Sequence, residues 1–227
     1  MKSYYYDDIE GDQRLAHHSG EDVTVEDLNK IGVLAFVGIG EDRVEAIAKE
    51  RGYKNRDEIN VSKAGMGDIY EEKIKGFFKE HLHEDEEIRY IKEGRGYFDV
   101  RGAFIHSAST ILSWIRAFLA ALADPPTPPY ACQLVLDTWP RTPLPPDPSQ
   151  TRWIRVAVEP RDLLIVPAGI FHRFTLDSGD FIKAVRLFQD EPKWVPHNKA
   201  PELEQNPHRV QYLSSLQNGI GSPLSTA

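Results

Sequence analysis

The chain has 227 residues, of which 41% are hydrophobic, so it can bury a core and is not a wholly disordered protein. Acidic residues outnumber basic ones by 35 to 27, and the net charge of -8 argues against a nucleic-acid partner. The single cysteine, Cys132, excludes an intrachain disulfide and any zinc site built from several cysteines. The N-terminus carries no apolar secretory core, which predicts a location in the cytoplasm, with the nucleus as a second compartment.

The first part of the chain, residues 21–80, is predicted to be a mainly helical N-terminal region. Three helices, in which hydrophobic residues recur at helical spacing, are predicted at 24–30, 41–51 and 68–79. Thr24 and Asp68 are expected to cap the first and the third of them. Between the first two helices, the apolar run 33–37 predicts a buried strand.

From His81 onward the hydrophobic pattern changes to a period of two, which is typical of short strands. Six strands are predicted, at 88–92, 97–101, 153–158, 163–166, 172–176 and 183–188. Turn residues separate some of them, at 94–96 and 167–169. Many short strands with turn signals predict a small β-barrel of the jelly-roll type, so the fold class is mainly β with α.

The stretch 102–151 differs in composition from its surroundings. It contains no Lys or Glu, only five charged residues in fifty, and nine of the sixteen prolines. Such a density of proline cannot run through a sheet or a helix interior. We interpret 102–151 as an inserted loop between two strands, either disordered and lineage-specific or a translated intron, without which the barrel can close.

The first half of this insertion, 105–123, is apolar enough to raise a transmembrane alternative. Arg116 and several Ser and Thr residues interrupt it, and roughly 19 residues only just reach the minimum span. A short surface helix, or no stable structure, is favoured, and no membrane is expected as a partner. The whole chain 1–227 is therefore predicted as one domain, with barrel-core segments at 81–101 and 152–190 and a C-terminal extension at 191–227.

A histidine- and acid-rich segment follows the last predicted helix. Residues two apart on a strand share a face, so His81 and His83 point the same way, and Glu87 has the same parity. His172 begins a later strand and shares parity with Phe174, which makes it the candidate for a fourth ligand. Imidazoles and a carboxylate converging in this way suit a redox-active or borderline divalent ion rather than Mg²⁺ or Ca²⁺.

Structural interpretations compete with the metal site. The His-x-His pattern also fits an exposed polar turn, and a single inward histidine such as His172 is more often a satisfied core residue. The joint occurrence of the two motifs favours the metal site. The acidic run 84–86 is interpreted as a solvated turn, and His17, His18 and His197 are assigned no role.

The histidine motifs resemble the two motifs of the cupin superfamily, His81-x-His83-x3-Glu87-x6-Gly94 and Pro167-x-Gly169-x2-His172. The glycine before His81 lies one residue closer than usual, at Gly76, and Leu176 replaces the Asn that often closes the second motif. Longer strings closely resemble acireductone dioxygenases, at 71–75, 81–91, 96–101, 166–175, 183–188 and 191–194. The resemblance covers most of the chain outside 102–151.

This resemblance implies a dioxygenase of methionine salvage whose metal ligands are His81, His83, Glu87 and His172. The implied cofactor is Fe(II), with Ni(II) as the alternative. The Fe(II) form would cleave an acireductone to 4-methylthio-2-oxobutanoate and formate, and the Ni(II) form would yield carbon monoxide, formate and 3-methylthiopropanoate. The implied partners are this small molecule and O2, and a monomer is expected.

The resemblance also assigns substrate contacts. Arg89 and Arg186 are predicted to be catalytic, because a guanidinium that faces a barrel interior needs an anionic partner such as the substrate. A buried ion pair with Glu87 or Asp99 is the structural alternative for these arginines. Three aromatic residues would wall a pocket for the thioether tail or else be plain core, namely Phe77, Phe174 and Trp194.

Two other functions fit the same pattern. A metal-dependent cupin isomerase or epimerase would use the same ligands with Zn²⁺ or Mn²⁺ and consume no oxygen. It also needs a general base, and no Glu or Lys is clearly placed for one. A catalytically disabled cupin would keep only a binding role, with the insertion at 102–151 as the disabling feature.

Overall fold

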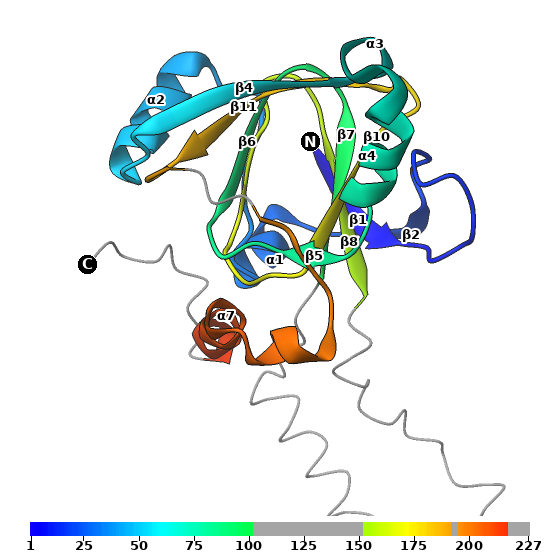
Figure 1. The fold of residues 1–227 in the computed structure, drawn as a ribbon. Helices are drawn as coiled ribbons and strands as arrows, with labels where there is room; N and C mark the ends of the chain where they lie inside the picture. The colour runs from blue at the N-terminus through cyan, green and yellow to red at the C-terminus, as the bar shows by residue number, and fades with distance from the viewer. Residues whose placement is uncertain (102–151, 192–194, 218–227) are drawn as a thin grey trace, which may run out of the picture. The chain divides into compact units, whose positions relative to one another are not determined.

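The computed structural model describes residues 1–101, 152–191 and 195–217, all of which belong to one compact unit. Its strands form two sheets. The seven-stranded sheet has the order β12-β5-β10-β7-β8-β1-β2, and the five-stranded sheet has the order β3-β9-β6-β11-β4. Every strand pair among the described residues is antiparallel. The two sheets face each other (Figure 1), which confirms the predicted jelly-roll class of fold.

The strands of the seven-stranded sheet are β1 (Lys2–Tyr6), β2 (His18–Asp22), β5 (His81–Leu82), β7 (Gly96–Arg101), β8 (Trp153–Val158), β10 (His172–Leu176) and β12 (His197–Asn198). Those of the five-stranded sheet are β3 (Leu34–Phe36), β4 (Asn55–Ser62), β6 (Glu87–Gly94), β9 (Leu163–Val166) and β11 (Phe181–Phe188). Strands β8, β9 and β10 begin and end at the predicted residues, and β6, β7 and β11 extend the predicted ranges by one or two residues.

The helices lie outside the two sheets. They are α1 (Val25–Lys30), α2 (Glu41–Glu50), α3 (Lys63–Met66), α4 (Tyr70–Phe77) and α7 (Pro207–Gln217), with short 3-10 turns η1 (Gly67–Ile69) and η3 (Pro201–Gln205). Thr24 caps α1 as predicted, since its hydroxyl accepts a hydrogen bond from the backbone N–H of Asp27 at 3.1 Å. The predicted cap at Asp68 is wrong. That residue lies inside η1, which continues directly into α4.

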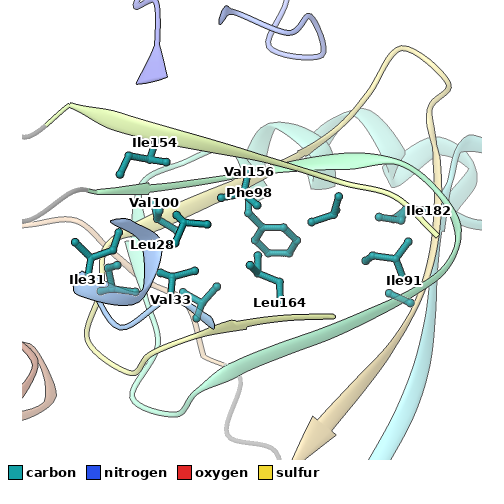
Figure 2. Close-up of a cluster of buried hydrophobic side chains, with 14 of the residues drawn as sticks. Leu28, Ile31, Val33, Ile91, Phe98, Val100, Ile154, Val156, Leu164 and Ile182 are labelled. Atoms are coloured by element: carbon teal, nitrogen blue, oxygen red, sulfur yellow. The ribbon is translucent and has the colours of Figure 1, made fainter. Parts of the chain in front are cut away.

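The main core lies between the sheets. Figure 2 shows Phe98 of β7 pointing toward Leu164 of β9, and Val100, Ile154 and Val156 extend the cluster along the seven-stranded sheet. These side chains come from alternate positions, as the period of two requires. A second cluster covers the outer face of the five-stranded sheet, where α2 packs on β6, β9 and β11 through Val44, Ile47, Ile88, Tyr90, Ile165 and Leu187.

The prediction that residues 21–80 are mainly helical needs correction, because this region also contains strand β4. This strand pairs with β11 along its whole length, from Asn55 opposite Phe188 to Ser62 opposite Phe181. Only Val61 of its residues is buried, because β4 is an edge strand with one face toward solvent. Its polar sequence therefore carried little hydrophobic signal. The strand predicted at 33–37 is present as β3, but its residues are half-buried and not buried as predicted, because β3 is the other edge strand of this sheet.

Strands β7 and β8 flank the predicted insertion 102–151, which lies outside the described residues together with the candidate membrane segment 105–123. At the end of the β7–β8 ladder, Arg101 pairs with Trp153, so the two ends of this connection meet as neighbours in one sheet. No helix in the described part of the chain is long and apolar enough to cross a membrane. The predicted domain boundaries stay predictions.

Candidate metal centre

Four side chains from both sheets converge at one point. His81 lies on β5 and pairs with His172 at the start of β10, while Glu87 begins β6 in the opposite sheet. One ligand atom from each of His81, His83, Glu87 and His172 lies within 4.8 Å of the others, and all four residues are buried. The predicted ligands are therefore brought together within the space that one ion occupies.

Each of the three histidines is oriented by a backbone carbonyl. Nδ1 of His81 donates to the carbonyl oxygen of Lys79 at 2.7 Å. In the same way, Nδ1 of His83 donates to the carbonyl oxygen of Val195 at 3.2 Å, and Nδ1 of His172 to that of Ile170 at 3.0 Å. A carbonyl oxygen can only accept, so Nδ1 carries the hydrogen and Nε2 keeps its lone pair. This is the orientation that metal-ligating histidines adopt, with the far ring nitrogen donating to a backbone carbonyl or a carboxylate.

Glu87 completes the donor set. Its Oε2 lies 2.7 Å from Nε2 of His172 and 3.5 Å from Nε2 of His83. Lone pairs on neutral imidazoles and a carboxylate oxygen repel one another at these distances unless a cation lies among them. The residues therefore fit a divalent metal ion, and the N₃O donor set suits iron, nickel or zinc better than magnesium or calcium.

Burial and charge hold three of the ligands, His81, His83 and Glu87, in their metal-binding forms. Desolvation, together with the nearby His172, lowers the pKa of His81 to about 4, and desolvation also lowers the pKa of His83. Burial alone would raise the pKa of Glu87, but the charge of Arg89 and the contact with His172 outweigh burial and hold this pKa well below its usual range. Neutral imidazoles and an ionised carboxylate at neutral pH bind a metal without first releasing protons.

Gly169 controls the turn that leads into His172. Its φ of 77° lies in the left-handed region, and a Cβ at this position would approach the carbonyl oxygen of His208 to 2.3 Å. Its N–H donates to the carbonyl oxygen of His83 at 2.9 Å. Gly169 thus links the turn before His172 to the backbone of His83 by a hydrogen bond.

The metal ligands line a cavity of about 670 Å³. The rest of its wall is largely apolar and comes from both sheets and α4, with Ile59, Val61, Met66, Phe77, Ile91, Phe98, Phe174, Ile182 and Ala184. The ring of Phe174 lies 4.8 Å from that of Phe98 and 6.3 Å from that of Phe77. Phe77 and Phe174 thus lie where a pocket wall was predicted, and their contact with a substrate stays a prediction. Trp194 lies outside the described residues.

Arg89 and Arg186 both line this cavity. Nη2 of Arg89 contacts Oε1 of Glu87 at 2.7 Å, as the structural alternative predicted, and burial lowers the pKa of this arginine to about 10. Arg186 instead binds Asp57 of β4, with Nε donating to Oδ1 at 2.7 Å. The expectation of a pair with Asp99 is wrong for both arginines, because Asp99 binds Arg155 and Arg173.

The chain is similar to known proteins over most of its length. A model of the ARD/ARD' family matches residues 2–119 and 147–196. The chain belongs to this family. Among relatives in the ARD/ARD' family, acireductone dioxygenase 1 of Coprinopsis cinerea is 46% identical over 98% of this chain and 100% of its own. The acireductone dioxygenase of Aspergillus fumigatus is 45% identical over 96% of this chain and 98% of its own.

A solved structure of the family shows a weaker likeness. The acireductone dioxygenase from Bacillus anthracis with cadmium ion in the active center matches with a TM-score of 0.48 and 21% identity, over 76% of this chain and 86% of that chain. Inside the chain, the ARD/ARD' match leaves out 120–146, a stretch that lies within the predicted insertion 102–151.

Other predictions around the centre of this ARD/ARD' family member need correction. The acidic run 84–86 is only partly a solvated turn, because Glu86 binds Nη2 of Arg51 and the hydroxyl of Tyr53, each at 2.6 Å. His17 is buried, and its Nδ1 lies 2.9 Å from a carboxylate oxygen of Asp7. Sequence reasoning also missed Asp57 and the carbonyl of Val195, since neither belongs to a motif.

Proposed function

We propose that the protein is an acireductone dioxygenase that cleaves 1,2-dihydroxy-3-keto-5-methylthiopentene with O2 to 4-methylthio-2-oxobutanoate and formate in methionine salvage. The observation that carries this proposal is a four-ligand centre set in the wall of a largely apolar cavity. Membership of the ARD/ARD' family and two relatives named as acireductone dioxygenases, each covered over nearly its full length, support it.

We assign His81, His83, Glu87 and His172 as the metal ligands, with their imidazoles held by backbone carbonyls. A metal held by these residues would bind the oxygens of an ene-diolate and activate it toward dioxygen. Fe(II) is the proposed ion. Ni(II), which suits the same donors, is the alternative and would direct the products to carbon monoxide, formate and 3-methylthiopropanoate.

Residues of the chain supply binding and orientation. Arg89 holds Glu87 ionised through its contact at 2.7 Å and lines the cavity beside the ligands, where it can face an anionic substrate. The apolar wall, including Phe77 and Phe174, suits a thioether tail and excludes water from the reacting end. We assign Arg89 and Arg186 to substrate binding. The monomeric state and the location in the cytoplasm or the nucleus stay predictions.

The test is oxygen uptake by the protein loaded separately with Fe(II) and with Ni(II). We expect aerobic turnover of the acireductone, with 4-methylthio-2-oxobutanoate from the iron form and carbon monoxide from the nickel form. The His172→Ala variant is the control, because it keeps the cavity and loses one ligand. Conversion of the acireductone without oxygen would favour an isomerase, and absence of bound metal would favour a binding protein. Either result contradicts the proposal.

A further inference from the structure

Three neighbouring strands place a row of charged residues along the inner face of the five-stranded sheet. The register sets Arg89 of β6 opposite Arg186 of β11, and Arg186 opposite Asp57 of β4. Directly opposed residues in an antiparallel pair bring their Cβ atoms to about 5 Å, so two like charges at Arg89 and Arg186 destabilise each other.

Each of these arginines has a carboxylate of its own. Glu87 contacts Arg89, and Asp57 grips the Nε–Nη2 edge of Arg186 with both carboxylate oxygens. A two-point contact between a guanidinium and a carboxylate fixes the plane of the guanidinium as well as its position. Asp57 therefore helps to fix the position and the plane of the Arg186 guanidinium.

Asp57 does not itself line the metal-bearing cavity within the described residues, whereas Arg186 does. The Asp57 side chain is 41% exposed and lies on the edge strand β4, on the opposite side of Arg186 from Arg89. It thus holds Arg186 from the edge of the sheet. Without this carboxylate, repulsion from Arg89 and the flexibility of a long side chain would favour movement of the Arg186 guanidinium away from its place in the cavity wall.

We propose that Asp57 is a positioning residue for substrate binding, which acts by holding Arg186 in the wall of the metal-bearing cavity, where it meets the anionic substrate. This inference rests on the proposed function. It adds a residue from β4, a strand that supplies none of the four metal ligands and lies in the part of the sequence predicted to be mainly helical.

The experiment compares Asp57→Asn with Glu58→Gln, the neighbouring residue on the opposite face of β4. Glu58 also forms ion pairs, with Lys183 at 3.0 Å and Lys92 at 3.4 Å, but away from the cavity. We expect Asp57→Asn to raise KM about tenfold with kcat changed less than about threefold and metal content unchanged, while Glu58→Gln leaves KM as it is. Asp57→Glu should recover part of the loss. An unchanged KM in Asp57→Asn, or an equal rise in Glu58→Gln, overturns the inference.

A double variant tests whether Asp57 acts through Arg186. In an Arg186→Met background, Asp57→Asn should raise KM by no further factor, because the group that it positions is gone. A second, multiplied increase in KM contradicts the inference and points to a general structural role. Thermal unfolding of each variant measures such a role directly.

Anaerobic titration separates this inference from the proposed function. The acireductone is added without O2 to metal-loaded protein, and its absorption reports a Kd that needs no turnover. If the wild type binds the acireductone but consumes no O2, the proposed function fails, and the Kd ratio of Asp57→Asn to wild type still decides the inference. If the wild type does not bind it, both fail.

Discussion

Strand β10 separates two buried charged clusters of opposite character. On its inner face, His172 joins the metal ligands, and on its outer face the next residue, Arg173, binds Asp99 at 2.8 Å. Asp99 also makes a two-point contact with Arg155, whose remaining donors reach the carbonyl oxygens of Gln13 and Leu15.

In the outer cluster the charges are paired within the chain, although Nη2 of Arg173 is buried without a hydrogen-bond partner among the described residues. The guanidinium of Arg173 lies over the rings of Phe78 and Trp153 at 4.1 Å and 4.4 Å, which adds cation–π attraction to its ion pair. The inner cluster instead turns three imidazoles and a carboxylate toward one point, an arrangement that suits a cation. A buried cluster whose opposite charges are paired with one another indicates a structural role, and one whose donors converge on a single point indicates a metal-binding site.

Removing an inner ligand should have the largest effect. In His172→Ala we expect bound metal to fall from one equivalent to less than about 0.1 after dialysis, with dioxygenase activity lost, because three ligands retain neither the chelation nor the binding free energy of four. Elemental analysis and oxygen uptake measure the two effects, and circular dichroism checks the fold. Stoichiometric iron or nickel with full activity would disprove the ligand assignment.

Breaking the outer cluster should affect stability and spare the metal. Arg155→Met leaves the fully buried Asp99 short of its main partner, and we expect a loss of about 3–5 kcal/mol in the free energy of unfolding. Arg152→Met is the matched control. Arg152 makes a similar two-point contact with Glu21 at the surface, so its loss should cost no more than about 1 kcal/mol. Urea unfolding gives both values, and a drop in metal per folded molecule would contradict the separation of the clusters.

Arg89→Met tests a charged residue that lines the metal-bearing cavity and is not itself a metal ligand. It leaves all four ligands in place and removes the cation beside Glu87. We expect metal content to persist and the Kd for the acireductone to rise about 30-fold, which corresponds to about 2 kcal/mol. Arg56→Met, which removes an exposed arginine paired with Glu45, should leave Kd unchanged. Unchanged binding in a fully metallated Arg89→Met would return Arg89 to a structural role.

Shortening the β7–β8 connection should have the smallest effect and disturb neither cluster. Arg101 and Trp153 are already paired, so replacing 102–151 by Asn-Gly leaves a three-residue hairpin loop that includes Arg152. The shorter loop lowers the entropic cost of closure by at most about 2.5 kcal/mol, so stability should be equal or higher. Thermal unfolding and metal analysis test this. A shortened chain that fails to fold would show that 102–151 is needed for the barrel.

Much of the barrel could be predicted because its inner strands are short runs rich in apolar and β-branched residues, several of them bounded by turn residues. The ends of β8, β9 and β10 follow from these runs, and parity placed the four ligands on one side before any contact was known. The ligand motifs also lie within single short segments, so their spacing is visible along the chain.

The parts that could not be predicted depend on long-range pairing or on main-chain atoms. Asp57 contacts Arg186 across 129 positions of the sequence. The position of β4 in the sheet follows from its pairing with β11, which the sequence of β4 alone does not reveal. Arg155 likewise finds Asp99 across 56 positions, so the assignment of Asp99 to the cavity arginines failed. The carbonyl that orients His83 belongs to Val195, and no side-chain pattern reveals such an acceptor.

That carbonyl has a consequence for how the protein is made on the ribosome. All four ligands have been synthesised once residue 172 is added, and the last strand of the five-stranded sheet ends at Phe188. The acceptor for His83 emerges only with Val195. A premature stop codon at 190–194 would therefore spare every ligand and still remove a contact that orients His83, and loss of such a partner weakens metal affinity by roughly 10–100-fold. Chains that end before Val195 should thus bind metal more weakly than the full-length chain, although they contain all four ligands.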